Sequence, residues 1–341
     1  MTESKAMIVG CASTTLTADE VSLFSEHKPW GLILFARNIG SAEEIMSLTA
    51  HFRDIVGRDN APVFIDQEGG RVQRIKSPIT QSYPSGATLG AIYKSDPQQG
   101  MRVAHTMSKL HAADLLPLGI NADCLPVLDV PVKGAHDVIG DRAYGYTAQA
   151  VADMGRAAAE GLLEGGVLPV IKHIPGHGRS MVDSHKDLPR VDAEHAELSA
   201  QDFEPFKQLA HMPMAMTAHV IYTALDDKLP ATTSKIVVET VIRGEIGFDG
   251  LLMTDDLSMH ALSGDFGDRT DASFAAGCDV VLHCNGVMDE MLPVCEATPV
   301  LSGKALERAE AATALLQQPD DAAEKVAMLR DEFNALVSAV A

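Results

Sequence analysis

Eight short and almost continuously apolar segments recur along the 341-residue chain, and they constrain its fold more than any other feature. Such runs are typical of parallel strands that are covered on both faces. Longer amphipathic stretches, which we expect to be helices, lie between them. The predicted strands are Met7–Ala12, Gly31–Phe35, Pro62–Asp66, Asn121–Leu128, Leu168–His173, Ala215–His219, Leu251–Asp255 and Val280–Cys284, and the predicted helices include Ser41–Val56, Gln99–Leu116, Thr147–Glu164, Ser234–Ile242 and Arg269–Ala276.

Eight alternations of strand and helix predict an α/β fold, a (β/α)₈ TIM-type barrel. A doubly wound open sheet is the alternative, because periodicity alone does not show whether a sheet closes. The tail from residue 303 to residue 341 is rich in Ala, Glu and Leu, and it predicts terminal helices packed outside the barrel. The sequence contains no internal repeat or linker, so we expect a single catalytic domain over residues 1–341.

The composition disfavours several classes of partner. The net charge is −20, and a field of that sign repels phosphate backbones and anionic lipids. The five cysteines are odd in number and widely spaced, without a CxxC pair, which is typical of reduced thiols in a cytoplasmic protein. The N-terminal residues do not resemble a signal peptide, and no run of 18 apolar residues occurs. We therefore expect a cytoplasmic protein that binds neither nucleic acid nor membranes.

Polar side chains gather where the predicted strands end. Asp66 ends the third strand, Lys172 and His173 end the fifth, His219 ends the sixth, and Asp255 ends the seventh. Active sites of (β/α)₈ barrels form at the carboxyl ends of the strands. The barrel prediction therefore brings these groups to one mouth.

The segment from Lys172 to His185 is dense in groups that can do chemistry. Its three histidines do not have the spacing of a helical HExxH zinc site, and a Pro-Gly pair interrupts them, so we expect no metal. Asp183 lies two residues before His185, and a carboxylate there could orient the imidazole and raise its basicity. From the residues alone, these two could equally be polar residues of a surface loop.

Two further segments offer carboxylates and arginines. Asp255 and Asp256 follow a buried strand, and such a carboxylate can be a metal ligand, a base or a nucleophile. We expect Asp255 to be the reactive group and Asp256 to be a helper or a cap. Asp66 can accept hydrogen bonds from two sugar hydroxyls. Arg74 and Arg142 could supply positive charge, or could simply pair with neighbouring acids.

In combination these segments resemble the bacterial cytoplasmic β-N-acetylglucosaminidases of glycoside hydrolase family 3. The matching pieces occur in family order over roughly residues 7 to 290, and the length fits members that have a single barrel. They are Gly31–Asn38, Asp66–Arg74, Lys172–Gly178 with Asp183–His185, Met216–His219 and Thr254–Met259. The sequence departs from the commoner family residues at Ile174, at Thr254 and at His260–Leu262, and none of these positions carries a proposed catalytic group.

The resemblance implies a retaining hydrolase with a covalent glycosyl-enzyme and no cofactor. Asp255 matches the nucleophile, and His185 matches the proton donor and acceptor with Asp183 as its partner. The sugar-binding positions match Asp66, Arg74, Arg142, Lys172 and His173. The implied substrate is N-acetylglucosamine linked to 1,6-anhydro-N-acetylmuramic acid, with or without its peptide, in peptidoglycan recycling. We expect a monomer.

Three other functions compete with this interpretation. A β-N-acetylglucosaminide phosphorylase could use the same fold, because a neutral histidine tolerates an incoming phosphate better than a carboxylate does. A non-catalytic sugar-binding protein could retain the barrel, although the complete set of Asp183, His185 and Asp255 argues against it. A metal-dependent barrel enzyme is the third.

Overall fold

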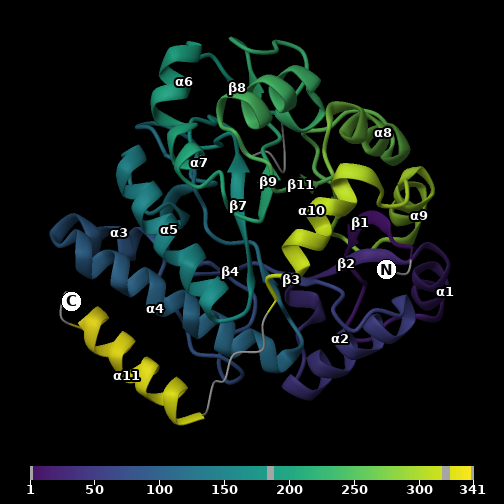
Figure 1. Ribbon diagram of the computed structural model, residues 1–341, viewed down its shortest axis with the longest axis horizontal. Helices are drawn as coiled ribbons and strands as arrows, with labels where there is room; N and C mark the ends of the chain where they lie inside the picture. The colour runs from purple at the N-terminus through teal and green to yellow at the C-terminus, as the bar shows by residue number, and fades with distance from the viewer. Residues whose placement is uncertain (1–2, 183–187, 317–322, 339–341) are drawn as a thin grey trace.

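The computed structural model describes residues 3–182, 188–316 and 323–338, and eight parallel strands form a closed barrel at its centre (Figure 1). β1 pairs with β2 on one side and with β12 on the other, so the sheet closes. The predicted barrel is confirmed, and the alternative of an open sheet is wrong. In barrel order, the strands are β1 (Lys5–Val9), β12 (Val280–His283), β11 (Leu251–Asp256), β9 (Met214–Thr217), β7 (Leu168–Ile174), β6 (Ala122–Asp123), β3 (Val63–Ile65) and β2 (Pro29–Leu34).

Helices surround this barrel, and local signals in the sequence set several of their ends. Ser41 caps α2 and forms a capping box with Glu44. Asp96 caps α4, which begins two residues before the predicted start. The helices are α1 (Ala18–His27), α2 (Ala42–Val56), α3 (Gly86–Ser95), α4 (Pro97–Leu115), α5 (Ala148–Glu164), α6 (His195–Gln201), α7 (Glu204–Gln208), α8 (Phe266–Ala276), α9 (Met288–Ala297), α10 (Gly303–Thr313) and α11 (Ala323–Ser338).

Two predicted elements differ from the structure. The helix expected at Ser234–Ile242 is a π-helical segment, Val237–Glu245. The strand expected at Asn121–Leu128 is regular only over β6, because the Leu125 N–H bonds back to the Asp123 carbonyl and Pro126 has no N–H to donate. Beyond this interruption the segment still runs beside β7, where Val127 forms an isolated parallel bridge with Lys172. Two short strand pairs were not predicted, namely β4 (Gln67–Gly69) with β5 (Val72–Gln73) and β8 (Arg190–Val191) with β10 (Ile221–Tyr222).

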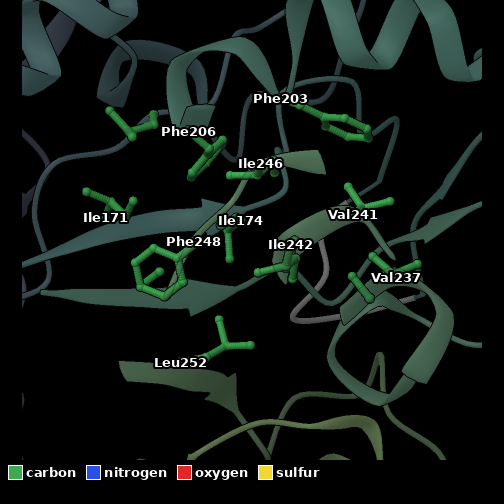
Figure 2. Close-up of a cluster of buried hydrophobic side chains, with 14 of the residues drawn as sticks. Ile171, Ile174, Phe203, Phe206, Val237, Val241, Ile242, Ile246, Phe248 and Leu252 are labelled. Carbon is green, nitrogen blue, oxygen red and sulfur yellow. The ribbon is translucent and has the colours of Figure 1, made fainter. Parts of the chain in front are cut away.

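The apolar core forms two layers, one inside the barrel and one between the strands and the helices. Figure 2 shows part of the outer layer, where Ile171 of β7 and Leu252 of β11 lie among residues such as Phe206 of α7. The residues on either side of Leu252, Leu251 and Met253, belong to the inner layer. This alternation follows from the two-residue period of a strand, and it fixes which side chains face the barrel axis.

The C-terminal tail forms two helices, as predicted. The second of them, α11, lies along α4 at the edge of the molecule (Figure 1). In the described part of the chain, no helix combines the length and the apolar character needed to cross a membrane.

Candidate active site

A cavity of about 590 Å³ opens where the strands end. The two-residue period of the strands explains which side chains reach it. In β7, Leu168 and Val170 face the barrel interior, so Lys172 faces the cavity. The same alternation directs Asp66, two residues after Phe64, and Asp255, two residues after Met253, into the cavity.

The sugar-binding set predicted from the sequence lies in this one cavity. Its wall includes Asp66, Arg74, Arg142, Lys172 and His173, together with Asp255. Segments that are far apart in the sequence therefore meet as the barrel prediction requires. The proposed dyad of Asp183 and His185 lies outside the described residues.

Asp66 is the centre of a cluster of charges. Its Oδ1 atom lies 2.8 Å from Lys172 Nζ, and its Oδ2 atom lies 2.9 Å from Arg74 Nη2. Burial would raise the pKa of Asp66, but Lys172 and Arg74 hold it well below its usual range. Asp66 is therefore ionised at neutral pH and can act only as a hydrogen-bond acceptor.

Glu68 lies in the same motif as Asp66 but was not among the predicted functional residues. Its carboxylate accepts two hydrogen bonds from Arg142, over 2.8 and 2.7 Å, and lies 2.6 Å from Lys172 Nζ. Burial would lower the pKa of Lys172, but Asp66 and Glu68 together raise it. The Lys172 ammonium is thus held between two carboxylates, and the cluster of three cations and two anions has one net positive charge.

Asp129 is a second buried acid that the sequence analysis missed. Its Oδ2 atom lies 2.6 Å from His173 Nδ1, and its Oδ1 atom accepts the backbone N–H groups of His173 and His177. Burial would raise the pKa of Asp129, but His173 and then His177 lower it to about 2. An ionised carboxylate can only accept, so Asp129 fixes the proton of His173 on Nδ1. The available signal was an acid directly after a predicted strand.

The two adjacent carboxylates at the end of β11 have different environments. The Asp256 carboxylate accepts the N–H and hydroxyl of Ser258 and the N–H of Cys284, which ties the β11 turn to the end of β12. Both residues line the cavity, and the Asp255 Oδ1 atom accepts the Asp256 N–H over 2.8 Å. The Asp256 carboxylate therefore stabilises the turn, although it does not cap a helix.

His219, which ends the sixth predicted strand, contacts the backbone of the β11 turn at Asp256. It is fully buried, with Nδ1 2.7 Å from the Thr232 hydroxyl and Nε2 3.0 Å from the Asp256 carbonyl. Burial lowers the pKa of His219, so the ring is neutral at pH 7. A neutral ring that donates Nε2–H to this carbonyl holds the backbone of the β11 turn in place.

Comparison with known proteins assigns the chain to a family. Residues 2–317 match the model of the glycosyl hydrolase family 3 N-terminal domain. The chain belongs to glycosyl hydrolase family 3. The predicted family is confirmed, and so is the prediction that the chain is an enzyme, a glycoside hydrolase of the β-hexosaminidase type.

Relatives of this glycosyl hydrolase agree over most of its length. The chain is 40% identical to the beta-hexosaminidase of Alkalilimnicola ehrlichii over 82% of this chain and 80% of that protein. It is 36% identical to the beta-hexosaminidase of Chromobacterium violaceum over 94% and 93%. The solved structure of NagZ from Neisseria gonorrhoeae, in complex with N-trifluoroacetyl-D-glucosamine, is similar with a TM-score of 0.85 and 31% identity, over 99% and 97%.

Buried histidines predict how the stability of this glycosyl hydrolase depends on pH. Burial lowers the pKa of His111 to about 3 and that of His177 to about 4, whereas an unfolded histidine titrates near 6.5. The unfolded chain therefore binds protons that the folded protein does not, and each histidine lowers the stability as the pH falls from about 6.5 toward its folded pKa.

When the pH is lowered from 7 to 5, we expect the melting temperature of His111→Phe to fall by about 2–4 °C less than that of the wild type. Phenylalanine retains the aromatic partner of Tyr83, whose ring centroid lies 4.4 Å from that of His111. The Asp123 carboxyl lies 3.8 Å from His111 Nδ1, and burial raises its pKa to about 8, so it is mainly protonated between pH 7 and pH 5. Melting curves at the two pH values measure the difference, and identical losses would contradict the prediction.

Proposed function

We propose that this glycosyl hydrolase is a cytoplasmic, monomeric, retaining exo-β-N-acetylglucosaminidase. Its proposed substrate is N-acetylglucosamine linked to 1,6-anhydro-N-acetylmuramic acid, with or without peptide, which places it in peptidoglycan recycling. One observation carries the proposal. The Asp255 carboxylate lies in the same cavity as the charged cluster of Asp66, Arg74, Arg142 and Lys172. Beta-hexosaminidase relatives, and a NagZ structure that holds a glucosamine derivative, support the choice of sugar.

The charged cluster suits a sugar that has neighbouring hydroxyl groups. The ionised Asp66 accepts hydrogen bonds from hydroxyls, and the Lys172 ammonium and the Arg74 guanidinium donate them. Salt bridges fix all three side chains before the sugar binds, so little side-chain entropy is lost on binding. The cluster is thus suited to holding the terminal sugar with its anomeric carbon toward Asp255.

In the proposed first step, an Asp255 oxygen attacks the anomeric carbon while the bond to the leaving oxygen breaks. The leaving oxygen takes a proton from the His185 imidazolium, so the aglycone departs as a neutral alcohol and the ring becomes neutral. Water then attacks the glycosyl ester, gives its proton to His185, and releases the sugar and the Asp255 carboxylate. The two displacements retain the anomeric configuration. Phosphate in place of water in the second step would make the enzyme a phosphorylase.

The choice of histidine as the proton carrier has an electrostatic reason. Retaining glycosidases usually place two carboxyl groups about 5–5.5 Å apart, and two like charges at that distance oppose one another. An imidazolium that has given up its proton is a neutral imidazole, so it adds no second negative charge beside Asp255, whereas a carboxylic acid would become an anion. In this proposal Asp183 accepts the other ring N–H of His185 and stabilises the imidazolium.

The acid role of His185 predicts a dependence on the leaving group. We expect His185→Ala to lower kcat/KM about 100-fold more for an alkyl N-acetyl-β-glucosaminide than for the 2,4-dinitrophenyl glycoside. A dinitrophenolate departs without protonation, whereas an alkoxide does not. Steady-state assays of both substrates, with wild type as reference, measure the ratio. Equal losses on the two substrates would contradict the acid role.

Mass spectrometry of the products tests the substrate and the reaction together. The wild type is incubated with N-acetylglucosaminyl-1,6-anhydromuropeptide in phosphate buffer and, separately, in a phosphate-free buffer. We expect free N-acetylglucosamine and the anhydromuropeptide in both. Formation of N-acetylglucosamine 1-phosphate would indicate the phosphorylase instead. Binding of the muropeptide without products would indicate a sugar-binding protein.

A further inference from the structure

The helix α11 packs against Gln81 and Tyr83, which lie next to the proposed sugar site. The family model matches residues 2–317, and α11 begins at Ala323, beyond the matched residues. α11 lies along α4 (Figure 1), and its Phe333 is 97% buried in a cluster with Tyr83 and Met107. This burial anchors α11 on the segment that contains Tyr83.

Two side chains of α11 hold this segment. The Phe333 ring lies 5.8 Å from the Tyr83 ring, centroid to centroid, in an edge-on arrangement. The Arg330 guanidinium donates to Gln81 Oε1 over 3.0 Å and pairs with Asp114, whose carboxylate also accepts the Tyr83 hydroxyl proton over 2.6 Å. Residues 81–83, which we term the strap, are thus fixed from outside by an aromatic contact and by a charged hydrogen-bond network.

On its other side, the strap contacts the antiparallel pair β4–β5, which lies between Asp66 and Arg74 and which we term the hairpin. The Gln73 side chain accepts the Tyr83 N–H over 2.9 Å and donates to the Gln81 carbonyl over 2.7 Å. The Gly70 N–H donates to the Tyr83 carbonyl over 2.9 Å. At Gly69, which has a φ of +98°, an added Cβ would lie 2.3 Å from the Pro84 carbonyl oxygen. The strap and the hairpin are therefore in close contact.

The same hairpin delivers Arg74 to Asp66. Gln73 directly precedes Arg74, and the Arg74 N–H donates to Gln67 Oε1 over 3.0 Å. Gln67 directly follows Asp66 and is fully buried. A shift of the strap would move Gln73 and, with it, the guanidinium that pairs with Asp66 over 2.9 Å.

We propose that α11 is a positioning element of the sugar site, and that Arg330 and Phe333 act through the strap to hold Arg74 against Asp66. This inference rests on the proposed sugar-binding role of Arg74 and Asp66. A positioned guanidinium contacts the sugar in the ground state and in the transition state alike. Loss of its position therefore weakens sugar binding and leaves kcat nearly unchanged.

The experiment uses full-length Arg330→Ala and Phe333→Ala variants, with Glu332→Gln as the matched control. Glu332 lies on the same helix and pairs with Arg102 of α4, away from the strap. The inhibition constant of N-acetylglucosamine is measured with KM and kcat for 4-nitrophenyl N-acetyl-β-glucosaminide, below the melting temperature of every variant. We expect the inhibition constant and KM to rise roughly fivefold to twentyfold for both alanine variants, with kcat within about twofold. Glu332→Gln should match the wild type.

A double-variant comparison separates positioning from general stability. In an Arg74→Ala background, Arg330→Ala should change the inhibition constant less than about twofold, because the group that it positions is already absent. If Phe333→Ala does not fold, Phe333→Leu and Gln81→Ala test the same contacts. Unchanged inhibition constants in the folded variants of Arg330, Phe333 and Gln81 would overturn this inference alone. The same would follow if Arg330→Ala changed the inhibition constant equally with and without Arg74. Failure of the wild type to bind the sugar would overturn the proposed function with it.

Discussion

Replacement of Asp255 by alanine is expected to lower kcat for 4-nitrophenyl N-acetyl-β-glucosaminide by about 10⁴-fold or more, which corresponds to ~5 kcal/mol of activation free energy. The carboxylate is the only protein group in the proposed mechanism that forms a bond to the anomeric carbon. Sugar binding should persist, because the contacts of Asp66, Arg74 and Lys172 do not involve Asp255. The loss should therefore appear in kcat while the inhibition constant of N-acetylglucosamine stays near that of the wild type.

Two controls separate a missing nucleophile from a damaged site. Asp255→Asn retains an oxygen that can accept the Asp256 N–H, and it should be as inactive as Asp255→Ala. Azide added to Asp255→Ala should restore turnover and give the α-glycosyl azide, because a single displacement inverts the anomeric carbon. Retention of full activity in either variant would refute the assignment of the nucleophile.

Replacement of Lys172 by methionine is expected to lower kcat/KM by roughly 10²–10³-fold and the melting temperature by about 5 °C or more. The side chain of Lys172 is 2% exposed and lies between Asp66 and Glu68. Methionine fills a similar volume but leaves two buried carboxylates close together without the cation that separates them. Both the sugar contact and the electrostatic balance of the cluster are then lost.

Lys109→Met is the matched control for Lys172→Met. Lys109 pairs with Glu164 on the surface, with side chains that are 34% and 55% exposed, and solvent-exposed pairs contribute ~0–1 kcal/mol to stability. We expect its activity and melting temperature to stay close to those of the wild type. Melting curves and steady-state kinetics of both variants measure the two losses. A Lys172→Met enzyme that resembles Lys109→Met would show that the buried cluster does not hold the substrate.

The sequence predicted the barrel and most of the cavity because both depend on local patterns. The apolar runs mark the strands, and the two-residue period carries Lys172 and Asp255 to the inward face once the sheet closes. Strand ends of a parallel barrel converge, so Asp66 could be expected beside Lys172 although 106 residues separate them. Different roles for Asp255 and Asp256 could be proposed from the sequence. The sequence could not show their hydrogen-bond partners, because two adjacent carboxylates at a strand end give the same local signal.

The remaining features depend on contacts that no local pattern encodes. Asp129 meets His173 because the segment after β6 stays hydrogen-bonded beside β7, with the Leu128 N–H on the Lys172 carbonyl, and a proline-interrupted strand does not reveal that path. Glu68 acquires its role from Arg142, which lies 74 residues away. The contact of α11 with the strap joins Arg330 to Gln81 across 249 residues. The Ala-, Glu- and Leu-rich composition predicted that helix but could not indicate its partner.

The central claim is that Asp255 forms a covalent bond to the sugar, and trapping that intermediate tests it most directly. In His185→Ala, the first step with 2,4-dinitrophenyl N-acetyl-β-glucosaminide needs no acid, whereas the second step lacks its base, so the glycosyl-enzyme should accumulate. Intact-protein mass spectrometry should show the addition of one N-acetylglucosaminyl residue, and peptide mapping should place it on Asp255. An adduct on another residue, or turnover of the substrate with no adduct at Asp255, would contradict the account.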